Sequence, residues 1–185
     1  PSILIVEDTE EMIAVMIESL ANDYNIFLAK DGFQALEKLN KNDFVTIWLD
    51  GQMCGIPVLE VHDVLSRQTI TKVPKSPVAV AGVLNLRGQI VTAIDLRKRL
   101  KLKDRDEGME EMNIVVEYQK EPYSLIIDSV GDVLSLSEEA FERNPVTLDP
   151  HWQSVSNGIF RLENELLVIL DIEKLLTLDE SKVAA

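Results

Sequence analysis

One stretch of sequence occurs twice in this chain and decides its fold. Residues 82–100 read GVLNLRGQIVTAIDLRKRL, and they align without a gap to GIFRLENELLVILDIEKLL at residues 158–176. The aligned identities include Gly82 with Gly158, Leu86 with Leu162, Asp95 with Asp171, Lys98 with Lys174, and Leu100 with Leu176. A second pair of segments, IPVLEVHDVLS (56–66) and LIIDSVGDVLS (125–135), matches in the same order. The chain therefore contains an internal duplication.

Each copy consists of short β-type runs separated by turn signals. The signals are Asp50-Gly51, Arg87-Gly88, the Lys-Glu-Pro at 120–122 and the Glu-Asn-Glu at 163–165. Short strands with regularly spaced turns are typical of small antiparallel barrels. We therefore predict a mainly β fold, with two pseudo-equivalent barrel subdomains over residues 45–178. Asp95 and Asp171 each follow a strand and precede a turn rich in Leu and Lys, which predicts that both cap short helices.

The first 44 residues follow a different pattern. SILIV (2–6) and YNIFLA (24–29) are typical of strands, whereas Met12 to Leu20 and DGFQALEKLN (31–40) have apolar residues at helical spacing. A strand-helix-strand-helix order predicts parallel strands with right-handed crossovers. The expected organisation is thus a βαβα fragment over 1–44, the duplicated region over 45–178, and a short tail over 179–185.

Composition disfavours several classes of function. The net charge of −14 comes from 32 acidic and 18 basic residues, and no stripe of Lys and Arg could neutralise a phosphate backbone. No apolar run approaches the roughly 20 residues needed to span a bilayer, and no leader points to export, so we expect a cytoplasmic protein without direct membrane insertion. Cys54 is the single cysteine, and His62 and His151 are far apart. We expect no metal site and no catalytic residues.

The N-terminal fragment resembles a known family. ILIVEDTEEM (3–12) followed by LAKDGFQALEKL (28–39) is similar to the first two βα units of a response-regulator receiver domain, which has a flavodoxin-like fold. The resemblance implies that Glu7 and Asp8 are the acidic pair that holds magnesium, a cation that prefers carboxylate oxygens. By distance and context, Asp50 would be the phosphoacceptor. Residues 51–185 contain no strand-helix alternation that could complete a receiver. Half of a receiver joined to another domain is equally expected from a natural remnant and from an engineered chimera.

The duplicated region resembles a second family over about residues 44–178. VTIWLDGQMCGIPVLEVHDVL, GVLNLRGQIVTAIDLRKRL, LIIDSVGDVLSL and LLVILDIEKLL are similar to the bacterial chemotaxis coupling protein CheW. The resemblance implies two SH3-like five-stranded barrel subdomains, no enzymatic activity and no cofactor. Magnesium would bind only if the Glu7–Asp8 pair is functional. It also implies two partners, methyl-accepting chemoreceptors and the regulatory domain of the histidine kinase CheA.

The same resemblance implies the site residues. Arg87, in the Asn85-Leu-Arg-Gly turn, is expected to contribute to receptor and kinase coupling; the alternative is a structural ion pair with Asp63 or Asp95. Val61, Asp63 and Val133 match positions of the receptor-binding groove, although both valines could equally belong to the core. Pro57 and the apolar residues around it are expected to contact the kinase.

Two questions stay open in the sequence. Asp50-Gly51 is a strong hairpin signal, so Asp50 is expected in a turn, but the alternative function is a phosphorylatable switch that uses Glu7, Asp8 and Asp50. Two βα units would also leave unpaired strand edges and apolar faces. They are expected to pack on their own barrel or to pair with the same fragment of a second chain, which would give a symmetric homodimer.

Overall fold

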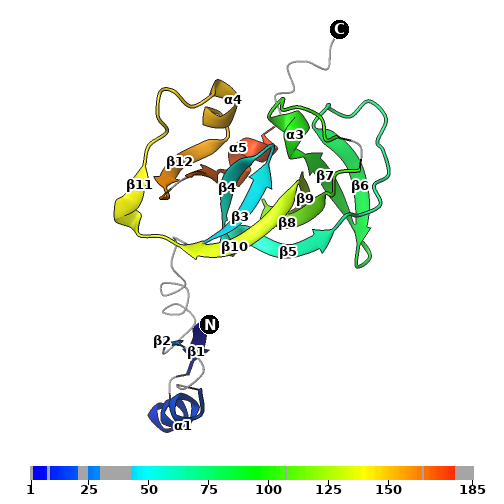
Figure 1. Cartoon of the computed structure of the whole chain (residues 1–185). Coiled ribbons are helices and arrows are strands. Elements are labelled where there is room, and N and C mark those ends of the chain that lie inside the picture. Colours follow the sequence, from blue (N-terminus) through cyan, green and yellow to red (C-terminus); the bar gives the residue numbers. More distant parts are fainter. Residues whose placement is uncertain are drawn as a thin grey trace. The chain divides into compact units, whose positions relative to one another are not determined.

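The chain divides into two compact units. The computed structural model describes residues 2–7, 9–20, 25–29, 43–106, 108–163 and 165–177 (Figure 1). The first unit covers Pro1–Asp43 and the second covers Phe44–Ala185. Each unit is described separately below.

The first unit contains a strand, a helix and a second strand. β1 (Ser2–Val6) pairs in parallel with β2 (Asn25–Ala29), and α1 (Glu10–Leu20) connects them. The Glu7 carboxylate accepts a hydrogen bond from the Thr9 backbone N–H at 3.0 Å, just before the helix begins. The predicted strand-helix-strand order and the parallel pairing are confirmed. Asp8 and the predicted helix at 31–40 lie outside the described residues.

The second unit is mainly β. Its strands are β3 (Asp43–Leu49), β4 (Gln52–Pro57), β5 (Val61–Ser66), β6 (Val80–Leu86), β7 (Gln89–Asp95), β8 (Met112–Tyr118), β9 (Glu121–Ile127), β10 (Ser129–Ser135), β11 (Phe141–Glu142), β12 (Ser156–Arg161) and β13 (Leu166–Leu170). The helices are short: η1 (Val58–Glu60), α3 (Leu96–Arg99), η2 (Glu138–Ala140), α4 (Pro150–Gln153) and α5 (Ile172–Leu176). The first repeat runs from β3 to α3 and the second from β8 to α5.

Each repeat contributes strands to both sheets. One sheet has the order β10-β3-β4-β13-β12-β11 and the other has the order β5-β8-β9-β7-β6 (Figure 1). The first two strands of a repeat therefore lie in one sheet, and its remaining strands, three in the first repeat and four in the second, lie in the other. The parallel pairs β7–β9 and β13–β4 are equivalent and have the same register. Thr92 pairs with Tyr123 in the first, and the aligned residues Val168 and Cys54 pair in the second.

The prediction of two closed five-stranded barrels is wrong. The sheets have six and five strands, neither closes into a barrel, and neither is formed by one repeat alone. Alternating strands from both sheets bury their apolar residues in one main core, which includes Ile47, Ile94, Ile114, Leu125 and Val168. The physical reason for the correction is that a strand pattern fixes which side chains face the core but does not fix which strand pairs with which.

The local signals were predicted correctly. Asp50 and Gly51 form the β3–β4 turn with positive φ angles of 52° and 80°, and Arg87 and Gly88 form the β6–β7 turn with 52° and 90°. The third turn is displaced from the predicted 120–122, because Pro122 lies inside β9 and the positive φ angles occur at Gln119 and Lys120. Both predicted caps are present.

The caps and the glycine bulges repeat as well. The Asp95 carboxylate accepts from the Arg97 N–H at 3.0 Å, and that of Asp171 accepts from the Lys174 N–H at 3.0 Å. Register shifts occur in the β6–β7 pair at Gly82 and in the β12–β13 pair at Gly158. Gly82 has φ +148°, and a Cβ atom there would overlap the Thr71 carbonyl oxygen.

We predict that Gly82→Ala destabilises the second unit by about 3 kcal/mol, because the side chain needs a strained φ and displaces backbone. Gly88→Ala is the matched control: its φ is +90°, but nothing lies within 4 Å of the added carbon. It should cost only about 1 kcal/mol. Urea unfolding of the two variants measures the difference. Equal decreases in the free energy of unfolding would show that the close approach of Thr71 does not destabilise Gly82→Ala.

Candidate functional site

The β6–β7 turn presents Arg87 to solvent. Leu86 pairs with Gln89 across the two-residue turn, and positive φ at Arg87 and Gly88 matches the twist of the flanking strands. The Asn85 side-chain oxygen accepts a hydrogen bond from the Gly88 N–H at 2.8 Å. Asn85 therefore fixes the turn that carries Arg87, and the side chain of Arg87 is 83% exposed.

Arg87 forms an ion pair with Asp63. Its Nη2 lies 3.0 Å from the Asp63 Oδ2. Asp63 is in β5 and Arg87 follows β6, and these two strands are the opposite edges of the five-stranded sheet. The sheet is therefore curved enough for its two edge strands to be joined by a side-chain ion pair. In a closed barrel, backbone hydrogen bonds would join these two strands instead. Of the two partners expected for a structural ion pair, the structure selects Asp63.

The other predicted site residues lie in different environments. Val61 opens β5 and is half-buried against the main core. Val133, in β10, is 57% exposed. It aligns with Val64 of β5, which is also exposed. Pro57 ends β4 and precedes η1, in which Leu59 is exposed. Val61 therefore packs partly against the core, whereas Val133 is not a core residue.

Asp50 is exposed and lies at the edge of a largely buried ionic cluster. Its backbone N–H donates to the Asp128 Oδ2 at 2.7 Å, and its own Oδ1 lies 3.1 Å from the Arg97 Nη1. The Arg97 side chain is almost completely buried and donates from Nε and Nη2 to the Asp128 carboxylate, at 2.8 Å and 2.7 Å. Asp50 is a turn residue, as the hairpin signal predicted.

Arg105 and Asp95 complete this cluster. The Arg105 Nε lies 3.0 Å from the Asp128 Oδ1, and its Nη1 lies 3.3 Å from the Asp95 Oδ1. Burial by itself raises the pKa of Asp128, but hydrogen bonds from Arg97 and from the Asp50 N–H outweigh it and hold this pKa below its usual value. The cluster ties the β3–β4 turn of one sheet to α3 and to the end of β9 in the other.

Sequence reasoning missed this cluster. Arg97 aligns with Glu173 in the second repeat, and Asp128 aligns with Leu59. A duplicated position that is positive in one copy and negative in the other indicates that its charged partner also differs between the copies. That signal was available in the alignment, although the identity of the partner was not.

Two further findings concern the described residues alone. Among them, no three His, Cys, Asp or Glu side chains are placed to hold a metal ion. No helix in the same described ranges is long and apolar enough to cross a membrane. Cys54 is fully buried, and this burial raises the pKa of its thiol.

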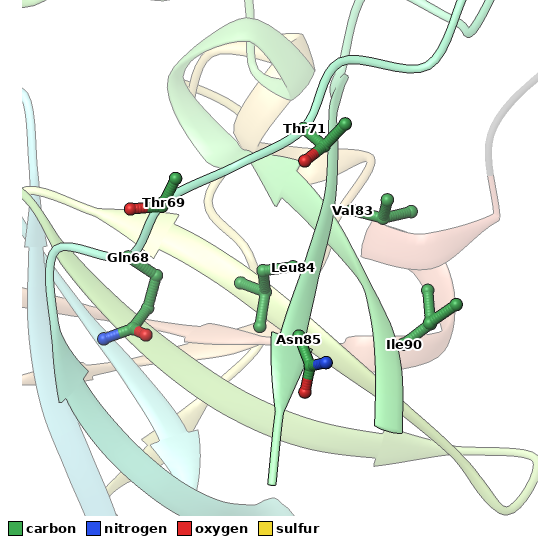
Figure 2. Close-up of a pocket in the computed structure, with 7 residues that line it drawn as sticks. All are labelled: Gln68, Thr69, Thr71, Val83, Leu84, Asn85 and Ile90. Atoms are coloured by element: carbon green, nitrogen blue, oxygen red, sulfur yellow. The ribbon is translucent and has the colours of Figure 1, made fainter. Parts of the chain in front are cut away.

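A shallow groove lies beside the turn that carries Arg87. It has a volume of about 490 Å³ and runs along β6. Figure 2 shows its lining residues: Gln68, Thr69, Thr71, Val83, Leu84, Asn85 and Ile90. Gln68 and Thr69 belong to the segment after β5, so the groove lies between that segment and the edge of the sheet.

The architecture defines a duplicated β domain in which two repeats share two sheets and one main core. Comparison with known proteins identifies its family. Residues 43–180 match the model of the CheW-like domain. The chemotaxis protein CheW of Klebsiella aerogenes is 31% identical over 75% of this chain and 83% of its own length. That of Bacillus subtilis is 30% identical over 76% and 90%. The crystal structure of the scaffolding protein TtCheW from Thermoanaerobacter tengcongensis superposes with a TM-score of 0.68 at 28% identity, covering 76% of this chain and 95% of that one.

The chain belongs to the CheW-like domain family. It is a chemotaxis coupling adaptor without enzymatic activity, as the sequence predicted. The alternative of a receiver-type switch gains no support, because Asp50 lies in the β3–β4 turn and is bound by Arg97. The family match begins at residue 43, so the receiver character of residues 1–44 remains a prediction.

We predict that Asp128→Asn destabilises the second unit by about 3 kcal/mol at pH 7, because Arg97 is left as a buried charge with a weakened partner. The lowered pKa of Asp128 means that its contribution is complete above about pH 4. This contribution is lost as the pH falls through the folded-state pKa.

Urea unfolding at pH 7 and pH 3 measures this effect. The free energy of unfolding should fall less between the two pH values in Asp128→Asn than in the wild type. Asp104→Asn, at an exposed position, should keep the full pH dependence. An unchanged pH dependence in Asp128→Asn would refute the assignment to this carboxylate.

Proposed function

We propose that this chain acts in the cytoplasm to couple methyl-accepting chemoreceptors to the regulatory domain of the histidine kinase CheA, with Arg87 as the central contact. The observation that carries the proposal is the exposed Arg87–Asp63 pair. Asp63 fixes one end of the guanidinium at 3.0 Å, while most of its five N–H donors remain available to a partner. An orienting bond of this kind reduces the entropy lost when a carboxylate binds.

The pair occurs in one repeat only, which favours a contact role. Arg87 aligns with Glu163 and Asp63 aligns with Asp132, so the second repeat has two acidic residues at the matching positions. Both repeats fold into equivalent strands, so the fold itself does not need this ion pair. An exposed pair also contributes only about 0.2–1 kcal/mol to stability. A single contact point would give the adaptor one orientation toward its partner.

Exposed apolar residues supply the remaining contact area. Val133 and Val64 lie on the edge strands β10 and β5, and we assign them, with Val61, to the receptor. The predicted kinase contact at Pro57 includes Leu59, which is 49% exposed in η1. Pro57 positions this turn at the point where the chain leaves one sheet for the other.

We predict that Arg87→Ala weakens binding of a chemoreceptor signalling fragment by about 30-fold, the loss typical of an interface arginine near 2 kcal/mol. The unfolding temperature should change by less than about 3 °C. Arg161→Ala is a matched control, because Arg161 is exposed and forms a comparable ion pair with Glu142 at 2.8 Å. It should leave binding unchanged. Isothermal titration calorimetry measures both affinities.

The swap variant Arg87→Asp with Asp63→Arg separates the two roles of the pair. It restores the ion pair but exchanges the positions of the charges, so it should be stable and should still bind poorly. Wild-type affinity in the swap variant would show that Arg87 acts only inside the fold. A parallel titration with the CheA regulatory domain tests Leu59→Ser, which should weaken kinase binding and spare receptor binding. If neither partner binds the folded wild type, the proposed coupling function is wrong.

We also propose that the N-terminal unit pairs with a second copy of this chain. Among the described residues of this unit, α1 exposes Met12 and Val15, and β1 and β2 form a two-stranded parallel sheet with no further strand at either edge. Val15→Asp should shift the chain from dimer to monomer in sedimentation velocity at micromolar concentration. Val146→Asp, an exposed valine of the second unit, should not. A monomeric wild type at these concentrations would contradict the proposal.

A further inference from the structure

The edge strand β6 is only partly covered. Residues 68–71, which we call the strap, follow β5 and approach this edge. Thr71 exchanges both backbone hydrogen bonds with Val83, from N–H to carbonyl at 2.8 Å and 2.9 Å. Val83 therefore points its backbone groups away from β7 and toward the strap. The edge thus accepts an extended chain at this position.

The next outward-facing backbone groups belong to Asn85. In an antiparallel pair, residues alternate between those that bond the neighbouring strand and those that face outward. Val83 faces outward, so Asn85, two residues later, does as well. Among the residues that the structure describes, the strap bonds β6 only through Thr71. The groove opens at Asn85, between the β6 edge and the diverging Gln68 and Thr69 (Figure 2).

The second repeat covers its matching edge more completely. There, β11 pairs with β12 at two successive positions, Phe141 with Phe160 and Glu142 with Ile159. The Phe141 ring lies close to Gly158, just as Ile70 lies close to Gly82, so the strap and β11 are equivalent. The segment before β11 is two residues longer, counted from the aligned serines at 66 and 135, and it forms η2. The first repeat lacks this turn.

The groove has an uncharged lining with an exposed apolar side. None of its seven lining residues is ionisable, in a chain whose net charge is −14. Ile90 forms one wall and is 78% exposed. Ile90 also borders a second hollow of about 320 Å³, lined in addition by Gln89, Thr92, Glu121, Pro122 and Tyr123. Arg87 does not line the groove, but it is only two residues along the chain from Asn85, which does.

We propose that this groove binds a short, extended and uncharged peptide segment of a partner protein, which adds to the β6 edge at Asn85 and packs an apolar side chain on Ile90. Backbone hydrogen bonds to the free edge would provide affinity, and the Ile90 wall would provide selectivity. Absence of charge is favoured because the lining offers no counter-ion and the chain as a whole repels acidic segments. This site is separate from Arg87 and adds a second mode of contact to the proposed function.

The test is an amide NMR titration of the full chain with the peptide acetyl-Thr-Val-Thr-Val-Thr-Val-amide. The Asn85 amide and those of residues 68–71 should shift in a saturable manner. A peptide with the same sequence but N-methylated at every residue has no backbone N–H donor on either edge, so it cannot form the ladder with β6 and should cause no shifts there. A version with Glu in place of Thr should bind at least fivefold more weakly.

Two variants make the test specific. Ile90→Thr should weaken binding of the Thr-Val peptide about fivefold because it removes apolar area from the wall. Val146→Thr, at a valine that is also highly exposed, should have no effect. Equal shifts with the N-methylated peptide, or shifts centred on the β10 edge, would overturn the proposal. No receptor or kinase is present, so this result is independent of the coupling experiments.

Discussion

Each repeat of this chain places its first two strands in one sheet and its remaining strands, three in the first repeat and four in the second, in the other. The remaining features of the second unit depend on this sharing. It brings β4 beside β13 and β9 beside β7, so that these two parallel pairings of the second unit each join different repeats. It also means that the main core is filled from both repeats at once. The ionic cluster around Arg97 holds one of the two points where the chain passes between sheets, and η1 forms the other.

The two repeats keep the same backbone and differ in their charges. Arg87 and Arg97 both align with glutamates, and Asp128 aligns with the exposed Leu59. The duplicated positions that shape the strands, such as Gly82 and Gly158, are retained. A symmetric framework with asymmetric side chains can present a different surface at each end. An adaptor with two different partners needs such a difference.

Local features were readable from the sequence because they depend on residues close together in the chain. The Asp50-Gly51 hairpin needs two residues that tolerate positive φ, and the caps at Asp95 and Asp171 need a carboxylate beside free N–H groups. Asp63 was also one of the two partners expected for a structural ion pair with Arg87. Sheet membership could not be read, because the same alternating strand buries the same face in either sheet. The Arg97–Asp128 contact spans 31 residues, and no periodicity indicates it.

The shared sheets also set how this protein can assemble. A polypeptide with only one repeat would supply two strands to one sheet and three or four to another, and it would have to find a second molecule to complete either. Its folding would then depend on its concentration. Covalent linkage of the repeats makes the encounter intramolecular, with a local concentration in the millimolar range for a short connection. The duplicated chain can therefore be folded as a single copy, before any receptor or kinase is present.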